Sequence, residues 1–150
     1  ATGLYGNFGQ ANYAAAKLGM LGLAKTIALE GAKSGINCNC VAPFGATDMN
    51  SANFPDPLKK AINPDYIAPL IAFLSHDSCE ETGSMFEASA GSFKKVRFER
   101  SRGLNLDPRK DAITVDQIAE SWGEIVDFSV SEYPKNMGES LKIMYERTLE

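Results

Sequence analysis

The stretch that decides the fold is residues 5–43, "YGNFGQANYAAAKLGMLGLAKTIALEGAKSGINCNCVAP". From residue 12 to residue 31 it contains many alanines and leucines and no proline, and it ends on a glycine, which together predict a helix. Apolar residues occupy nearly every side of this helix, so we expect it to be buried on more than one face. Residues 36–42 then alternate largely between apolar and polar side chains, which predicts a strand.

The next part of the chain continues the alternation of helix and strand. Residues 43–62 have the composition of a loop, with a short helical segment at 57–62. Asn63-Pro64-Asp65 then provides a capping side chain, a proline and an acidic residue, which predict a helix to about Leu74 with a kink at Pro69. A strand is expected at 84–91. This order indicates an α/β fold with parallel strand pairing.

Beyond residue 91 the pattern changes. The run "KKVRFERSR" (94–102) is basic with interleaved apolar residues, which fits either contact with anionic groups or a strand-like structural segment packed at a subunit boundary. Residues 114–117 form a capping box before an amphipathic helix, and a weaker helix is expected after Pro134. We therefore divide the chain into 1–91 and a mainly helical extension, 92–150.

Composition narrows the possible functions. The chain has 150 residues and a net charge of −4, which argues against a nucleic-acid or membrane-surface binder. Its longest apolar stretch, 66–74, is about half of a membrane span. The three cysteines have no spacing typical of a metal site, so we expect reduced thiols and no bound metal. The single histidine, His76, lies at a helix end and is interpreted as structural.

Tyr13 and Lys17 are the strongest candidates for chemistry. They are four residues apart, so on a helix they share one face and the ammonium can approach the phenol. A nearby cation favours the charged form of a tyrosine, which can then exchange a proton with an alcohol. Chance matches to this spacing are expected, and an ordinary surface pair is the alternative interpretation.

The context of the pair resembles the short-chain dehydrogenase/reductase family. The shared features are Tyr-x-x-x-Lys in an alanine- and glycine-rich helix, the sequence Asn-Cys-Val-Ala-Pro at 39–43, and the segment "DYIAPLIAFLSHDSCEETGSMFEASAG" at 65–91. Residues 97–100, Arg-Phe-Glu-Arg, and the extension "ITVDQIAESWGEIVDF" at 113–128 are similar to the (3R)-hydroxyacyl-CoA dehydrogenase region of peroxisomal multifunctional enzymes.

The resemblance implies the C-terminal half of a Rossmann-type doubly wound parallel sheet, with a helical C-terminal extension. It implies that Tyr13 is the acid/base and that Lys17 activates it and binds the nicotinamide ribose. It also implies cofactor contacts from the loop after the strand, at Pro43, Phe44, Gly45, Ala46 and Thr47. Asp48 departs from the basic residue usual in these enzymes. The family's serine would fall just before Ala1, and its glycine-rich loop lies upstream.

By this resemblance the parent protein is an NAD-dependent 3-hydroxyacyl-CoA dehydrogenase of peroxisomal fatty-acid β-oxidation. We expect an acyl-CoA substrate, a homodimer and an enoyl-CoA hydratase domain downstream, with NADP left open as cofactor. We expect the present sequence to be an excerpt that is inactive alone. The alternatives are a non-catalytic dimerisation module derived from a dehydrogenase and a generic ketoreductase.

Overall fold

The computed structural model describes residues 1–48, 50, 52, 54–110 and 112–149. The chain forms two compact units, the N-terminal unit (1–96) and the C-terminal unit (97–150). The expected boundary at residue 91 lies in a turn of the N-terminal unit, and the domain assignment stays a prediction. No helix among the described residues is both long enough and apolar enough to cross a membrane.

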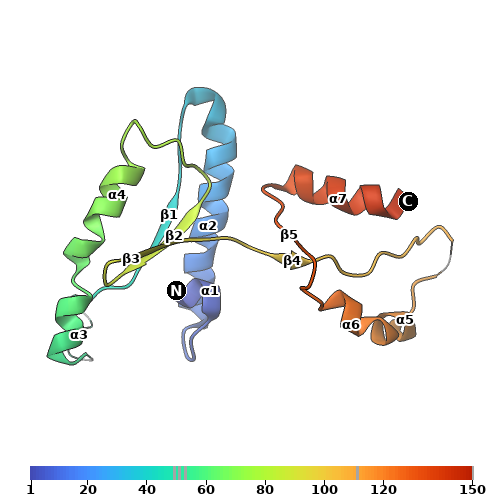
Figure 1. The fold of residues 1–150 in the computed structure, drawn as a ribbon, viewed down its shortest axis with the longest axis horizontal. Coiled ribbons are helices and arrows are strands. Elements are labelled where there is room, and N and C mark those ends of the chain that lie inside the picture. The colour runs from blue at the N-terminus through green and yellow to red at the C-terminus, as the bar shows by residue number, and fades with distance from the viewer. Residues whose placement is uncertain (49, 51, 53, 111, 150) are drawn as a thin grey trace. The chain divides into compact units, whose positions relative to one another are not determined.

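The N-terminal unit is an α/β structure, as the sequence predicts (Figure 1). Its helices are α1 (Thr2–Tyr5), α2 (Ala11–Gly31), η1 (Ala32–Ser34), α3 (Asp56–Ala61), η3 (Pro64–Tyr66) and α4 (Ala68–Leu74). The predicted helix from 63 to 74 is divided at Ile67: the Asn63 side chain accepts a hydrogen bond from the Asp65 amide and begins η3, and Pro69 lies in the first turn of α4.

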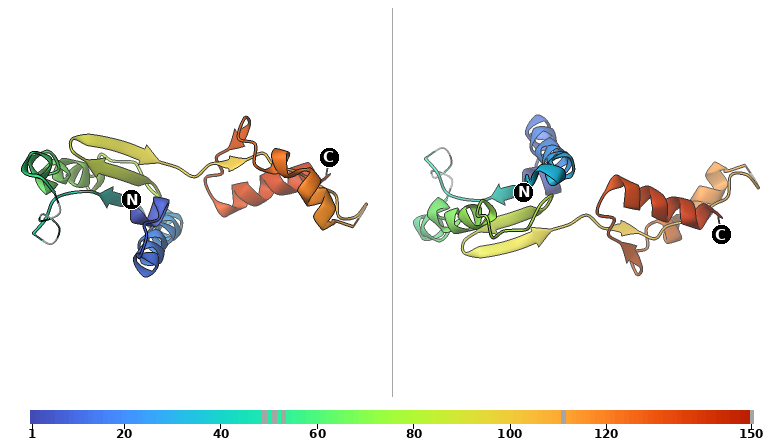
Figure 2. Two further views of the ribbon diagram at one scale, coloured as in Figure 1. Left: turned by 90° about the horizontal axis from the view of Figure 1, so that it is seen from below. Right: turned by 90° about the horizontal axis from the view of Figure 1, so that it is seen from above.

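Three strands form the sheet of this unit, in the order β1-β2-β3: β1 (Cys40–Pro43), β2 (Met85–Ser89) and β3 (Ser92–Val96). The pairing of β1 with β2 is parallel, as expected, and β3 returns antiparallel to β2. Figures 1 and 2 show α2 and α4 on opposite sides of these strands. The fold therefore has the layers of a Rossmann-type α/β sheet.

The strand predicted at 36–42 begins four residues later and ends at Pro43. Before Cys40, side chains take part in the pairing: Asn39 donates to the Glu81 carbonyl at 2.7 Å and accepts from the Ser84 amide at 3.1 Å. Asn37 likewise donates to the Cys79 carbonyl. These asparagines bind the segment before β2 through their amide groups, so a regular ladder forms only from Cys40 onward.

Burial of α2 is narrower than its composition predicts. Its buried residues are Leu21, Ala24, Ala28 and Gly31, which form one stripe, so the expectation of burial on several faces is wrong for this unit. Large apolar side chains remain exposed on its other sides, at Leu18, Met20, Leu23 and Leu29. The sheet covers only one face of a helix that is apolar nearly all round.

The C-terminal unit contains helices joined by a small sheet. Its elements are β4 (Arg100–Ser101), α5 (Val115–Glu120), α6 (Trp122–Ile125), β5 (Ser131–Glu132) and α7 (Met137–Leu149). The predicted capping box is present, since Thr114 and Gln117 bond to each other's backbone amides. Glu132 of β5 pairs with Arg100 of β4 at 2.8 Å and with Arg147 of α7, and these contacts join three elements.

Candidate active site

Tyr13 and Lys17 lie on one face of α2, as their spacing predicts. The Lys17 Nζ atom is 5.3 Å from the centre of the Tyr13 ring. Tyr13 is 49% exposed and Lys17 is also exposed, so both can be reached from solvent. An ammonium at this distance over an aromatic ring is within cation–π range. The structure therefore brings the two residues together in a form that can contact a ligand.

The beginning of α2 is fixed by polar side chains on each side of it. The Asn12 Oδ1 atom accepts a hydrogen bond from the Tyr13 amide at 2.8 Å, and the Gln10 carbonyl accepts from the Ala14 amide. Gln10 Oε1 in turn lies within hydrogen-bond distance of Thr2 Oγ1 and Asn7 Nδ2. The Asn12 bond satisfies the Tyr13 amide, one of those that a helix start leaves without a partner, and the Gln10 side-chain contacts join α1 and residue 7 to the start of α2.

The loop after β1 holds the other predicted site residues, and its backbone amides are largely engaged within the unit. The Phe44 amide donates to the Ala88 carbonyl at 3.0 Å, and the Ala46 amide donates to the Ile62 carbonyl at 2.9 Å. The Thr47 amide donates to Asn50 Oδ1 at 2.7 Å. Because these three amides are engaged, the residues would contact a ligand's carboxamide through their carbonyl oxygens and the Thr47 hydroxyl.

Close packing leaves little room for a side chain at position 45 of this loop. A Cβ atom there would lie 3.2 Å from Pro64 Cγ and 3.3 Å from the Ile62 carbonyl oxygen. The Gly45 carbonyl also accepts from Asn50 Nδ2 at 3.1 Å. Residues 43–47 are thus held against the start of η3, which gives the loop a defined shape.

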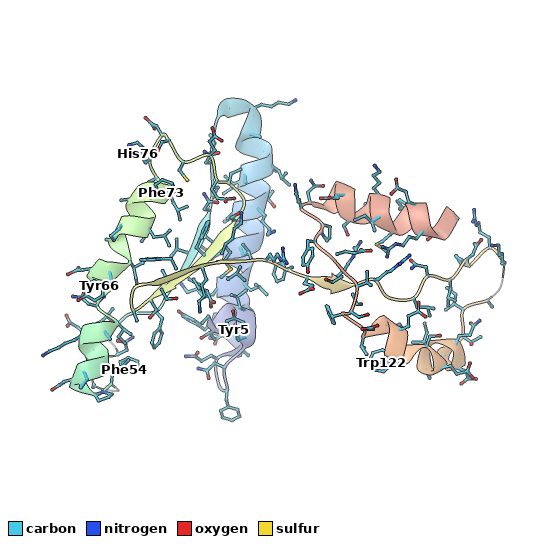
Figure 3. The ribbon with its side chains drawn as sticks, viewed as in Figure 1. Tyr5, Phe54, Tyr66, Phe73, His76 and Trp122 are labelled. Atoms are coloured by element: carbon cyan, nitrogen blue, oxygen red, sulfur yellow. The ribbon has the colours of Figure 1, made fainter. Side chains whose placement is uncertain are left out.

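The two groups of predicted site residues lie at one end of the N-terminal unit. In Figure 1, α1, the start of α2 and α3, which follows the loop, all lie at the lower end. His76 lies at the upper end, beyond α4 (Figure 3), where its Nδ1 atom accepts from the Ser78 amide at 3.1 Å. This local bond fits the structural role inferred for the histidine.

The basic segment 97–100 is engaged inside the C-terminal unit. The Arg97 guanidinium lies 3.6 Å from the centre of the Tyr133 ring, and the Tyr133 hydroxyl donates to Glu99 at 2.8 Å. Arg100 pairs with Glu132 and donates to the Ser140 hydroxyl at 2.7 Å. For Arg97 and Arg100, these contacts favour the structural interpretation over contact with anionic groups. Hydrogen bonds from Ser131 and Tyr133 hold the pKa of Glu99 below its usual value.

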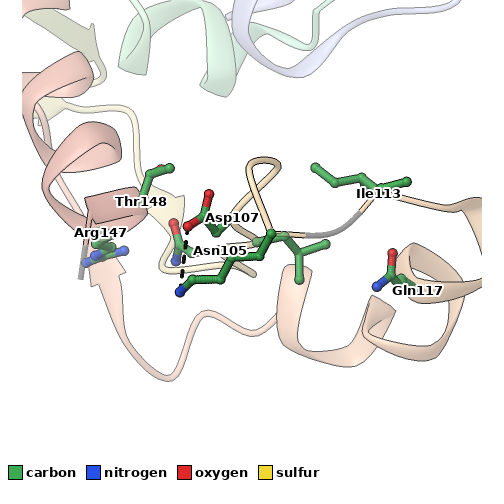
Figure 4. A pocket seen from close by; sticks show the side chains of 9 residues that line it. Asn105, Asp107, Ile113, Gln117, Arg147 and Thr148 are labelled. Carbon is green, nitrogen blue, oxygen red and sulfur yellow. Dashed lines mark ion pairs between the residues drawn. The ribbon is translucent and has the colours of Figure 1, made fainter.

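A pocket of about 260 Å³ lies in the C-terminal unit (Figure 4). Its ionisable lining side chains, among those described, are Asp107, Lys110 and Arg147. Asp107 pairs with Arg109 at 2.8 Å and with Lys110 at 3.6 Å, and Arg147 pairs with Glu132. Hydrogen bonds from Arg109 hold the pKa of the Asp107 carboxyl well below its usual range. The acid and the arginine thus already have partners, so Tyr13 and Lys17 on α2 stay the stronger candidates.

The segment that contains Tyr13 and Lys17 is similar to a known protein family. Residues 1–57 match the model of the short chain dehydrogenase family. The predicted resemblance to short-chain dehydrogenases is confirmed. The match includes α2, β1 and the loop after it, so all the candidate site residues lie inside the matched segment.

Individual relatives match nearly the whole chain. Peroxisomal multifunctional enzyme type 2 of Mus musculus is 46% identical over 140 residues, which are 93% of this chain and 19% of the relative. Peroxisomal hydratase-dehydrogenase-epimerase of Saccharomyces cerevisiae is 43% identical over 133 residues, 89% of this chain and 15% of the relative. The chain thus spans less than a fifth of the length of these relatives.

A solved structure extends the likeness to three dimensions. Full-length peroxisomal multifunctional enzyme type 2 from Drosophila melanogaster matches with a TM-score of 0.87 at 36% identity, over 99% of this chain and 27% of that one. The structural match includes residues beyond 57, where the family model ends. The predicted Rossmann-type α/β class is therefore confirmed.

Proposed function

We propose that this chain is part of a dehydrogenase that oxidises a (3R)-hydroxyacyl-CoA to a 3-ketoacyl-CoA with NAD. The observation that carries the proposal is the Lys17 ammonium beside the Tyr13 ring, within a segment that matches short chain dehydrogenases. The names of the relatives, which include a peroxisomal hydratase-dehydrogenase-epimerase, support a dehydrogenase and a peroxisomal location. We propose that its reaction belongs to fatty-acid β-oxidation. By the same likeness, we propose a hydratase domain elsewhere in the native protein.

In the proposed reaction Tyr13 is the general base. As the alcohol carbon is oxidised, the phenol oxygen of Tyr13, in its deprotonated form, takes the hydroxyl proton of the substrate. Lys17 stabilises the negative charge on that oxygen because its ammonium lies on the same helix face. A nicotinamide cofactor would supply the hydride acceptor when bound, so the alcohol would lose one hydride from carbon and one proton from its hydroxyl, the proton going to Tyr13.

The N-terminal unit offers hydrogen-bond donors and acceptors of the kinds that a nicotinamide cofactor needs. The exposed Lys17 ammonium can donate hydrogen bonds to ribose hydroxyls. The loop 43–47 offers carbonyl oxygens and the Thr47 hydroxyl, which lies 3.4 Å from Asn50 Oδ1 and is held by that contact. We propose NAD as the cofactor, with NADP as the alternative that a direct binding measurement separates.

The test is a stereospecific assay on the native protein that carries this sequence. We expect reduction of NAD with (3R)-hydroxyacyl-CoA and none with the (3S) isomer. Tyr13→Phe should lower kcat by about 10²- to 10⁴-fold and leave NAD affinity, measured by calorimetry, nearly unchanged. Tyr145→Phe, which removes a hydroxyl from an exposed tyrosine of α7, is the control. Full turnover by Tyr13→Phe would contradict the assignment.

A second candidate function is a non-catalytic dimerisation module, which the exposed apolar side of α2 favours. Leu23 is 56% exposed and Leu29 is 63% exposed, and apolar surface of this kind on a helix is typical of subunit contacts. Leu23→Glu should convert a dimer to a monomer in light-scattering measurements, with Lys33→Glu as the control. A dimer that shows no turnover with any hydroxyacyl or ketoacyl thioester would favour this module over both the dehydrogenase and a generic ketoreductase.

A further inference from the structure

The four-residue helix α1 lies against the part of α2 that contains Tyr13 and Lys17. A Cβ atom on Gly3 would be 2.9 Å from the Leu18 amide nitrogen and 3.3 Å from the Ala14 carbonyl oxygen. The backbone of α1 therefore touches the backbone of α2 directly, in the turn between the two candidate residues. Only glycine permits an approach this close without moving one of the two helices.

The other end of α1 is bonded to the sheet. The Tyr5 hydroxyl donates a hydrogen bond to Glu87 Oε2 at 3.1 Å. Glu87 lies in the middle of β2, where it is paired with Ala42 of β1 and with Lys94 of β3. The ladders on both sides hold the backbone of Glu87, so this side-chain bond ties α1 to the central strand of the unit.

We infer that α1 is a brace that holds the Tyr13–Lys17 turn of α2 at a fixed position relative to β2. Gly3 and Tyr5 are then positioning residues for the proposed dehydrogenase reaction, and the inference rests on that proposed function. Proton transfer requires the phenol oxygen to meet the substrate hydroxyl, and a displacement of about 1 Å can lower a rate by about 10²-fold. A brace at this turn limits such displacement.

The brace predicts that Tyr5→Phe, measured in the native protein, affects kcat and not binding. This variant keeps the ring and removes only the bond to Glu87. We expect kcat to fall on the order of 3- to 10-fold, while KM and cofactor affinity change less than about twofold. Glu87→Ala should give the same loss, and the double variant should lose no more, because both changes remove one bond.

Two further variants separate positioning from a general loss of structure. Glu87→Gln keeps an acceptor oxygen for the Tyr5 hydroxyl, so it should retain most of kcat. Tyr145→Phe should leave kcat unchanged, since that tyrosine lies on α7. Unchanged kcat in Tyr5→Phe, or a loss in Glu87→Gln equal to that in Glu87→Ala, would overturn the brace.

Hydrogen exchange tests the brace without activity. The amides of residues 14–18 should exchange faster in Tyr5→Phe than in the wild type, and Gly3→Ala should show a larger increase. If the wild-type protein has no turnover, the proposed function fails and the exchange result alone decides the inference. Equal exchange rates at 14–18 in wild type and Tyr5→Phe would overturn it.

Discussion

The buried hydrophobic side chains of the described chain all lie in the N-terminal unit, whereas most of its ion pairs lie in the C-terminal unit. In the N-terminal unit, Leu21, Ala24 and Ala28 of α2 are buried, and glycines permit close contacts between elements. In the C-terminal unit, Glu132 joins Arg100 and Arg147, and Arg109 holds Asp107.

Charged side chains thus serve different purposes in the two units: folding in the C-terminal unit and possible chemistry in the N-terminal unit. Lys17 lies exposed beside Tyr13, so its charge can act on a ligand. The Glu132 side chain is only 10% exposed and its charge is used to join β4, β5 and α7. Removal of a charge should therefore affect activity in the N-terminal unit and stability in the C-terminal unit.

The largest effect is expected for Lys17→Met in the native protein. Loss of the ammonium removes the charge that stabilises the deprotonated phenol, so kcat should fall by about 10²- to 10³-fold. The melting temperature should stay near that of the wild type because the side chain is exposed. Kinetics and calorimetry measure the two quantities, with Lys33→Met in η1, which follows α2, as control. A lowered melting temperature with unchanged kcat would show that the Lys17 charge serves stability and not activity.

The next effect concerns Glu132→Ala in the C-terminal unit. It leaves the guanidinium groups of Arg100 and Arg147 without their carboxylate, and loss of one partner from a mostly buried pair costs about 3 kcal/mol. Trp122 is the single tryptophan of the chain and lies in this unit, so its fluorescence reports local unfolding in urea (Figure 3).

The matched control for that variant is Glu120→Ala, at an exposed position of α5. A surface substitution of this kind should change the free energy of unfolding by less than about 0.5 kcal/mol. Equal stability of the two variants would show that the three-way ion pair does not hold the unit together.

A smaller effect on stability is expected from alanine at two glycines of α2, and its sign should differ between them. At Gly31 an added Cβ would lie 2.7 Å from Ile36 Cβ, so Gly31→Ala should destabilise the N-terminal unit by about 1–3 kcal/mol through overpacking. At Gly19 an added Cβ meets no described atom within 4 Å, so Gly19→Ala should stabilise the helix by about 1 kcal/mol. Thermal unfolding followed by circular dichroism measures both, and stabilisation by both would contradict the close contact at Gly31.

Local signals in the sequence predicted much of this structure. The composition of α2, the capping box at Thr114 and the cap at Asn63 each act within a few residues, and each element begins within about a turn of its expected position. The spacing of Tyr13 and Lys17 likewise predicted their shared face, because a regular helix determines it. Their catalytic role stays a prediction.

The features that the sequence did not reveal depend on contacts between distant residues. Tyr5 and Glu87 are far apart in the chain, and α1 lies before the first helix that the sequence predicts. The hairpin between β2 and β3 turns at Ala90 and Gly91, both with positive φ, and the Ala-Gly pair is a weaker signal than Asn-Gly. The Glu132 cluster brings together residues near 100, 132 and 147, which no local pattern relates.

The smallest effect is expected from mild acid, and it should appear first in the C-terminal unit. The pKa values of Glu99, Asp107 and Asp127 are all held below their usual values by hydrogen bonds from neighbouring groups. A carboxyl whose pKa is lower in the folded state stabilises that state above its unfolded pKa, and this contribution is lost as the pH falls below about 4. The N-terminal unit has one such carboxyl described, Glu81, whose pKa is lowered by Lys95.

Acid titration with two local probes measures that difference. Trp122 fluorescence should change at a higher pH than the exchange of amides in α2, because the two probes report different units. In Asp107→Asn the Trp122 fluorescence should depend less on pH below about 4, because the amide is not protonated in this range. In Glu120→Gln, the control, the pH dependence should be that of the wild type. Simultaneous acid transitions at both probes would mean that the two units unfold together, and that charge and apolar packing stabilise one cooperative structure.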